Sequence, residues 1–154
     1  MARSKSEILI TQSLIDRLVE HEQWPETRAA SISMFRESLK RDLEWLLNTR
    51  QPVMPELDSY PRTAASVLNF GFPDIHSFDG SAGKEQSAIT LSLERCIRTF
   101  EPRIRQPHVH LTRSDMLNRH LRFHIEGFVS YENMDEEIKF DTVLELISGE
   151  YEVK

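Results

Sequence analysis

The period of the hydrophobic pattern changes in the middle of this chain, and that change limits the possible folds more than any other feature. Before Pro102, apolar residues recur at spacings of three and four, as they do along one face of an α-helix. After Pro102 they recur at every second residue, as they do on one face of a β-strand. Pro102 cannot donate a backbone hydrogen bond and disfavours helical geometry at Glu101, so a helix should end there. The sequence predicts an α+β fold, with N-terminal helices packed on one face of a small C-terminal antiparallel sheet.

Three helices are predicted before this boundary. The first covers residues 6–20, with Leu14 and Leu18 on its apolar face and Asp16 off that face. The second covers residues 31–48, and the third covers residues 84–100. The second helix has a continuous apolar stripe, made of Ile32, Phe35, Leu39, Leu43, Leu46 and Leu47.

Four strands are predicted after the boundary, over residues 104–112, 120–130, 137–147 and 150–153. The last two form a hairpin that turns at Ser148-Gly149. Between the second and third helices, residues 51–83 contain four prolines and three glycines, so this long segment should be irregular, with one or two helical turns over residues 63–69. Because neither half of the 154 residues offers enough core by itself, we expect a single domain over residues 1–154, with a flexible N-terminal end.

The charges are arranged in two opposed blocks. Residues 132–154 carry eight acidic side chains against two lysines, whereas residues 95–122 carry seven arginines against two acids. The blocks either neutralise each other within the fold or face a partner. The acidic total of −6 and the lack of a basic patch interleaved with aromatic residues argue against nucleic acid. A single cysteine, no signal-like apolar run and no apolar stretch of about 18–20 residues predict a cytoplasmic protein without membrane insertion.

Two groups of residues are candidates for chemical sites. Glu101 could act as an acid in glycoside cleavage, but no second carboxylate is singled out near it, and Arg103 would stabilise it as a carboxylate when a general acid must carry a proton. His108 and His110 share one strand face, where a histidine of the next strand could complete a metal site or a pH-sensitive patch; solvated surface residues are the simpler interpretation. No catalytic residue, metal or cofactor is predicted.

Six blocks of the sequence resemble the TssE family of type VI secretion baseplate subunits, which is itself similar to a wedge protein of contractile-tail phage baseplates. The blocks are "SLIDRL", "RDLEWLLNTR", "SVLNFGFPDI", "FEPRI", "LRFHIEG" and "FDTVLELISGEYEV", in this order along the chain. The resemblance implies a non-enzymatic structural subunit that connects the baseplate to the contractile sheath. Because phage relatives have been labelled lysozyme-like, a peptidoglycan-cleaving hydrolase is the alternative.

The resemblance also implies partners. The triplet Glu101, Pro102 and Arg103, with Arg105, is expected to bind the helical core bundle of the TssF-like and TssG-like wedge subunits, and a TssK-like adaptor is expected nearby. The C-terminal strands, 137–147 and 150–153, are expected to meet the sheath subunits by strand addition. Their contact residues would be Phe140, Asp141, Glu145 and Glu150. The acidic excess would steer a basic partner strand, or it would only protect an exposed edge from aggregation.

Overall fold

The computed structural model describes residues 9–19, 24–74, 83–115, 120–131, 134–145 and 150–154. The chain divides into two compact units, Met1–Asp42 and Leu43–Lys154, and each is described by itself. The expectation of one domain over residues 1–154 stays a prediction. The expected flexible N-terminal end and the turn at Ser148-Gly149 lie outside the described residues.

The first unit contains helix α1 (Leu14–Leu18), which is much shorter than the helix predicted over residues 6–20. Ser13 caps its first turn by accepting a hydrogen bond from the Asp16 N–H, and Val19 is already extended. The predicted apolar face is wrong as well. Leu14 and Leu18 are 68% and 78% exposed, whereas Asp16 is buried, with an exposed fraction of 3%. Asp16 is buried because it forms an ion pair with Arg41, a contact that hydrophobic spacing does not reveal.

Helix α2 (Arg28–Asn48) begins three residues before its predicted start and ends at the predicted residue. Its early start is explained by Thr27, whose side-chain oxygen accepts a hydrogen bond from the Ala30 N–H at 3.2 Å. The predicted apolar stripe is confirmed, because five of its six members are buried and Ile32 is half-buried. The buried members are Phe35, Leu39, Leu43, Leu46 and Leu47.

The second unit begins with the end of α2 and continues through short helical turns. These are η1 (Pro55–Ser59), α3 (Pro61–Ala64) and η2 (Val67–Asn69). Gly71 then turns the chain with a φ of +119°, and a Cβ there would lie 2.4 Å from the Thr49 carbonyl oxygen. Helix α4 (Gly83–Phe100) begins within one residue of its predicted start and buries one apolar face, which includes Ile89, Leu93 and Ile97.

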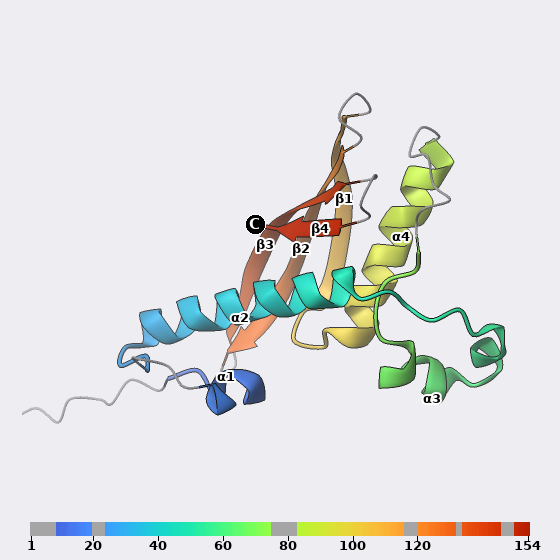
Figure 1. Cartoon of the computed structure of the whole chain (residues 1–154). Helices are drawn as coiled ribbons and strands as arrows, with labels where there is room; N and C mark the ends of the chain where they lie inside the picture. Colours follow the sequence, from blue (N-terminus) through green and yellow to red (C-terminus); the bar gives the residue numbers. More distant parts are fainter. Residues whose placement is uncertain (1–8, 20–23, 75–82, 116–119, 132–133, 146–149) are drawn as a thin grey trace, which may run out of the picture. The chain divides into compact units, whose positions relative to one another are not determined.

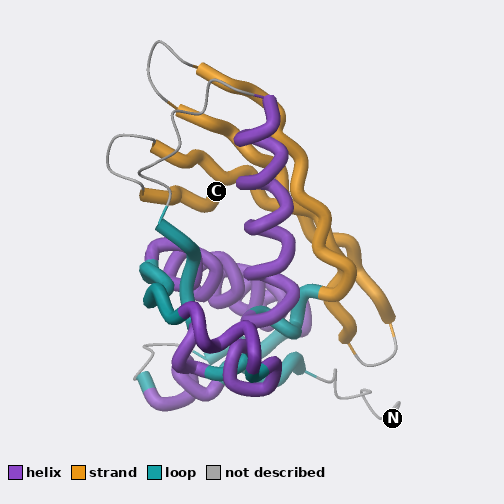
Figure 2. The backbone as a smooth tube through the Cα atoms, turned by 90° about the vertical axis from the view of Figure 1, so that its right-hand side faces the viewer, coloured by secondary structure: helices purple, strands orange, loops and turns teal. Residues whose placement is uncertain are grey.

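The sheet consists of β1 (Arg105–Asp115), β2 (His120–Tyr131), β3 (Met134–Glu145) and β4 (Glu150–Val153). The strands are antiparallel neighbours in the order β1-β2-β3-β4 (Figure 1). Alternate residues are buried on one face of the sheet, and α4 runs beside β1 (Figure 2). N-terminal helices and a C-terminal antiparallel sheet confirm the predicted α+β class.

Candidate functional site

A tight turn connects α4 to β1. The Ile104 N–H donates to the Glu101 carbonyl oxygen at 3.1 Å, so residues 101–104 form a β-turn with Pro102 at its second position. Proline suits this position because its fixed φ matches the turn. The sequence correctly placed the end of the helix here, and Pro102 itself is exposed.

The two charged side chains of this turn, Glu101 and Arg103, form an ion pair with each other. The Glu101 carboxylate is buried, at 5% exposure, and accepts hydrogen bonds from the Arg103 backbone N–H at 3.2 Å and from Arg103 Nε at 2.7 Å. Arg103 Nη2 donates to the other carboxylate oxygen, so the guanidinium holds both oxygens. The Glu101 carboxylate therefore forms part of the turn, and little of it is exposed.

The strand after the turn is irregular at its start. Arg105 is paired with Phe128 and His108 with Glu126, so β1 contains one residue more than β2 over this stretch. This bulge places Gln106 at a φ of +49°, which side chains rarely adopt. Gly127 lies opposite, where a Cβ would be 2.4 Å from Ile104 Cγ2, so the absence of a side chain there makes room for Ile104.

A shallow groove opens beside this turn and bulge. It has a volume of about 500 Å³, and we call it the basic groove because its lining contains three basic side chains and no acidic one. Arg105 is held in it by a hydrogen bond from Nη1 to Ser130 Oγ at 2.7 Å. The lining residues are Arg98, Pro102, Ile104, Arg105, Gln106, Pro107 and His108.

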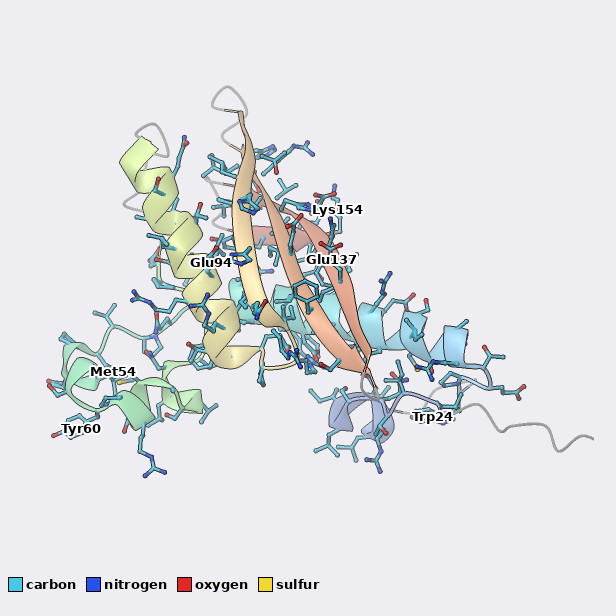
Figure 3. The ribbon with its side chains drawn as sticks, turned by 180° about the vertical axis from the view of Figure 1, so that it is seen from behind. Trp24, Met54, Tyr60, Glu94, Glu137 and Lys154 are labelled. Carbon is cyan, nitrogen blue, oxygen red and sulfur yellow. The ribbon has the colours of Figure 1, made fainter. Side chains whose placement is uncertain are left out.

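The outer edge of β4 is closed by two side chains of α2. Asn48 donates to the Tyr151 carbonyl oxygen at 2.9 Å and accepts from the Tyr151 N–H at 2.8 Å, as a neighbouring strand would. Glu44 accepts from the Val153 N–H at 3.0 Å. At the opposite edge of the sheet, Glu94 accepts from the Val109 N–H at 3.0 Å, and Figure 3 shows Glu94 on the side of α4 that faces β1. Helical side chains therefore occupy backbone groups on both edge strands.

The edge of β3 beside β4 is only partly covered. Strand β4 pairs with residues 142–145 of β3, and the Lys154 N–H donates to the Asp141 carbonyl oxygen at 2.7 Å. Backbone groups alternate in direction along a strand, so those of Lys139 and Glu137 point the same way as those of Asp141. Within the described residues, no strand pairs with them on that side.

The four residues expected at a sheath contact lie in different environments. Phe140 is buried on the core side of the sheet, with an exposed fraction of 7%. Asp141 is exposed, and its carboxylate lies 2.8 Å from His124 Nδ1. Glu145 is half-buried and Glu150 is exposed, and the two are paired across β3 and β4. The structure thus brings Glu145 and Glu150 together and places Phe140 in the core.

The strand histidines lie on the outer face, as their spacing predicts. The rings of His108 and His110 stack with centroids 6.5 Å apart, and His124 contacts Asp141 and Glu126. In the part of the chain that the structure describes, no three His, Cys, Asp or Glu side chains could hold a metal ion together. No helix in the described ranges is long and apolar enough to cross a membrane.

Sequence reasoning missed the residues that close the strand edges. Asn48, Glu44 and Glu94 are not among the residues that the sequence singled out for a contact. Asn48 and Tyr151 are 103 residues apart, so no local pattern connects them. A polar residue placed next to an apolar helix stripe is the only available signal, and it is not specific.

A family model described as baseplate wedge protein gp25 matches residues 33–134. The match covers more than half of the chain. It includes the turn at Pro102, the basic groove, the whole of β1 and β2, and the first residue of β3. No curated protein matches the sequence. The match agrees with the resemblance that the sequence blocks indicated.

Proposed function

The chain belongs to the family of baseplate wedge protein gp25, and from this membership we propose that it is a non-enzymatic baseplate subunit of a type VI secretion machine. The match over residues 33–134 is the observation that carries the proposal. In this role the protein works in the cytoplasm, binds the other wedge subunits and connects the baseplate to the contractile sheath.

The wedge subunits are proposed to meet the corner between α4 and β1. This corner is rigid, since Pro102 and the Glu101–Arg103 pair fix the turn and the bulge fixes the start of β1. A preorganised surface loses little conformational entropy on binding, which suits a permanent assembly. The partners proposed here are the TssF-like and TssG-like subunits, with a TssK-like adaptor joined through them.

The sheath is proposed to meet the sheet at the uncovered edge of β3. Glu44 and Asn48 already occupy the outer edge of β4, so an added strand finds its backbone partners at Glu137 and Lys139. Strand addition would supply main-chain hydrogen bonds, with side chains setting the register. The exposed carboxylates of Glu137 and Asp141 favour basic residues in the added strand.

Among the residues that the structure describes, none favours the hydrolase alternative. Glu101 is the residue that a lysozyme-like reading would choose, and both of its oxygens accept hydrogen bonds from Arg103. Glycoside cleavage needs a carboxyl group that can protonate the leaving oxygen across a cleft. We therefore assign Glu101 to the turn.

Co-expression tests the proposal. The chain is produced with the TssF-like and TssG-like subunits encoded in the same genome, and tagged TssG-like protein is used for purification. We expect this chain to elute with the wedge subunits as one complex at fixed stoichiometry in size-exclusion chromatography. A chain that elutes alone, with both partners folded and complexed to each other, contradicts the proposal.

A further inference from the structure

We propose that a groove along the first part of α2 binds a helix of a partner protein through two basic side chains that this helix carries. We call it the α2 groove, and its volume is about 940 Å³. Its described lining belongs to residues 24–37, all within the first unit. Most of this lining precedes residue 33, where the family match begins, so the inference does not rest on the proposed function.

One face of α2 forms the floor of the α2 groove. Ala30, Ser33, Met34 and Glu37 are three or four positions apart, so they lie along the same side of the helix. Fully buried Leu39 belongs to the opposite side, so the floor faces away from the apolar stripe. Ala30 and Ser33 are small and exposed, which allows another helix to approach α2 closely.

An aromatic side chain forms a wall of the groove where α2 begins. Trp24 is 47% exposed and lies on the segment that leads into α2 (Figure 3). Pro25 follows it and restricts the backbone beside the indole. Met34 adds apolar, polarizable surface further along the groove. Exposed indoles with apolar neighbours are typical anchors of protein–protein contacts, which favours a protein as the occupant.

Charge indicates what the partner carries. Glu26 and Glu37 are exposed, and the described lining contains these two acids and no basic side chain. Arg41, one turn beyond Glu37, is bound to Asp16 and Asp42 instead. Over the described ranges, no basic side chain forms an ion pair with Glu26 or Glu37. Two uncompensated carboxylates favour a basic partner, and they disfavour the phosphates of nucleic acid or of an anionic membrane.

The spacing of the two carboxylates sets the spacing of the basic residues. Eleven positions separate Glu26 from Glu37, which corresponds to about 15 Å along the axis of α2. Two residues eleven positions apart on a partner helix share one face and have the same separation. We expect arginine at both positions, because a guanidinium binds a carboxylate with two hydrogen bonds and stacks on an indole such as Trp24. Apolar residues between them would contact Met34.

A pair of synthetic peptides tests this spacing. The probe is a labelled helical peptide of about 18 residues, with two arginines eleven positions apart and two leucines between them on the same face. The control peptide has the same composition, with both arginines moved to the opposite face. Fluorescence anisotropy follows binding of each peptide to the full chain. We expect the probe to bind about tenfold more tightly than the control, with an affinity that falls as salt is added.

Two results would overturn the proposal. Equal affinity of the two peptides would show that the chain does not recognise paired basic side chains at this spacing. The absence of saturable binding of the probe would show that the groove does not bind such a helix.

Substitutions in the chain locate the contact. Glu37→Gln should weaken binding of the probe by about tenfold, because a charged contact is lost. Glu26→Gln should have a smaller effect, since Glu26 precedes α2 and the positive end of the helix already offsets part of its charge. Glu56→Gln is the matched control, an exposed carboxylate of η1 outside the groove lining, and should bind as wild type. All three variants should melt at the wild-type temperature. Unchanged affinity in Glu37→Gln would place the peptide elsewhere and contradict the assignment.

The fluorescence of Trp24 tests the contact with the groove wall. The chain has two tryptophans, so Trp45→Phe, a change outside the groove lining, leaves Trp24 as the single reporter. We expect the unlabelled probe to shift the Trp24 emission to shorter wavelength, with the affinity found by anisotropy, because bound peptide shields the indole from water. An emission maximum that stays unchanged when the peptide is fully bound would exclude Trp24 from the contact and refute the groove as the binding site.

Discussion

At the scale of individual residues, Asp16 is a buried carboxylate of the first unit. It is 3% exposed, and its carboxylate accepts hydrogen bonds from Ser13 Oγ and from Arg41 Nη1. Burial by itself raises the pKa of Asp16, but the hydrogen bonds from Arg41, Ser13 and Ser38 outweigh it and hold the pKa well below the usual value. Asp16 therefore stabilises the fold only while it is ionised.

This residue gives the first unit a defined pH dependence. Because the pKa of Asp16 is lower in the folded state than in the unfolded one, its stabilisation is complete above the unfolded pKa of about 3.9 and is lost as the pH falls toward the folded pKa. Asp16→Asn should cost about 1–3 kcal/mol of unfolding free energy at pH 7. The gap between the melting temperatures of wild type and variant should narrow as the pH is lowered below about 4. A gap that stays constant down to pH 2 would show that the carboxylate is not the stabilising group.

Among the secondary-structure elements, β4 is held along its outer edge by side chains of α2. It has four residues, and Asn48 occupies both outward backbone groups of Tyr151. Asn48→Ala should destabilise the protein by about 1–3 kcal/mol, because a buried N–H and C=O lose their partners. Asn48→Asp is the matched comparison: at pH 7 it keeps the acceptor for the Tyr151 N–H but places a carboxylate oxygen against the Tyr151 carbonyl oxygen, so it should cost at least as much as alanine. Urea denaturation followed by circular dichroism measures the free energy of unfolding of both variants. An alanine variant as stable as wild type would show that water replaces the Asn48 amide as hydrogen-bond partner of Tyr151.

The elements also show how far the sequence predicts this fold. The period of apolar residues located α2, α4 and all four strands, since each buries one face. It failed at α1, where a buried ion pair of Asp16 with Arg41 outweighs the local apolar pattern. The end of α4 before Pro102 was predicted correctly, whereas the closure of Glu101 by Arg103 depends on turn geometry, and the role of the triplet in binding stays a prediction. Edge closure joins residues 103 positions apart, and spacing carries no information about such contacts.

At the scale of the whole molecule, the two charge blocks of the sequence lie on different strands of one sheet. The arginine-rich block continues from the end of α4 into β1 and β2, next to the basic groove, whereas the acidic block forms β3 and β4. Some charges are paired across the outer face, as Lys139 is with Glu126 and Glu137. The two edges of the sheet therefore differ in charge.

The uncovered edge of β3 allows a test of the sheath contact that separates backbone from side chain. Lys139→Pro removes the N–H that points away from β2, so it should block strand addition while leaving the pairing of β2 with β3 in place. Lys139→Ala is the matched control, because it removes the same charge and keeps the N–H. We expect sheath subunits from the same genome to co-sediment with wild type and with the alanine variant, and to be lost with the proline variant. Circular dichroism must show that the proline variant is folded at the assay temperature. If the proline and alanine variants both co-sediment with the sheath subunits as wild type does, this edge is not the site of strand addition. If neither variant co-sediments with them, the contact depends on the charge of Lys139.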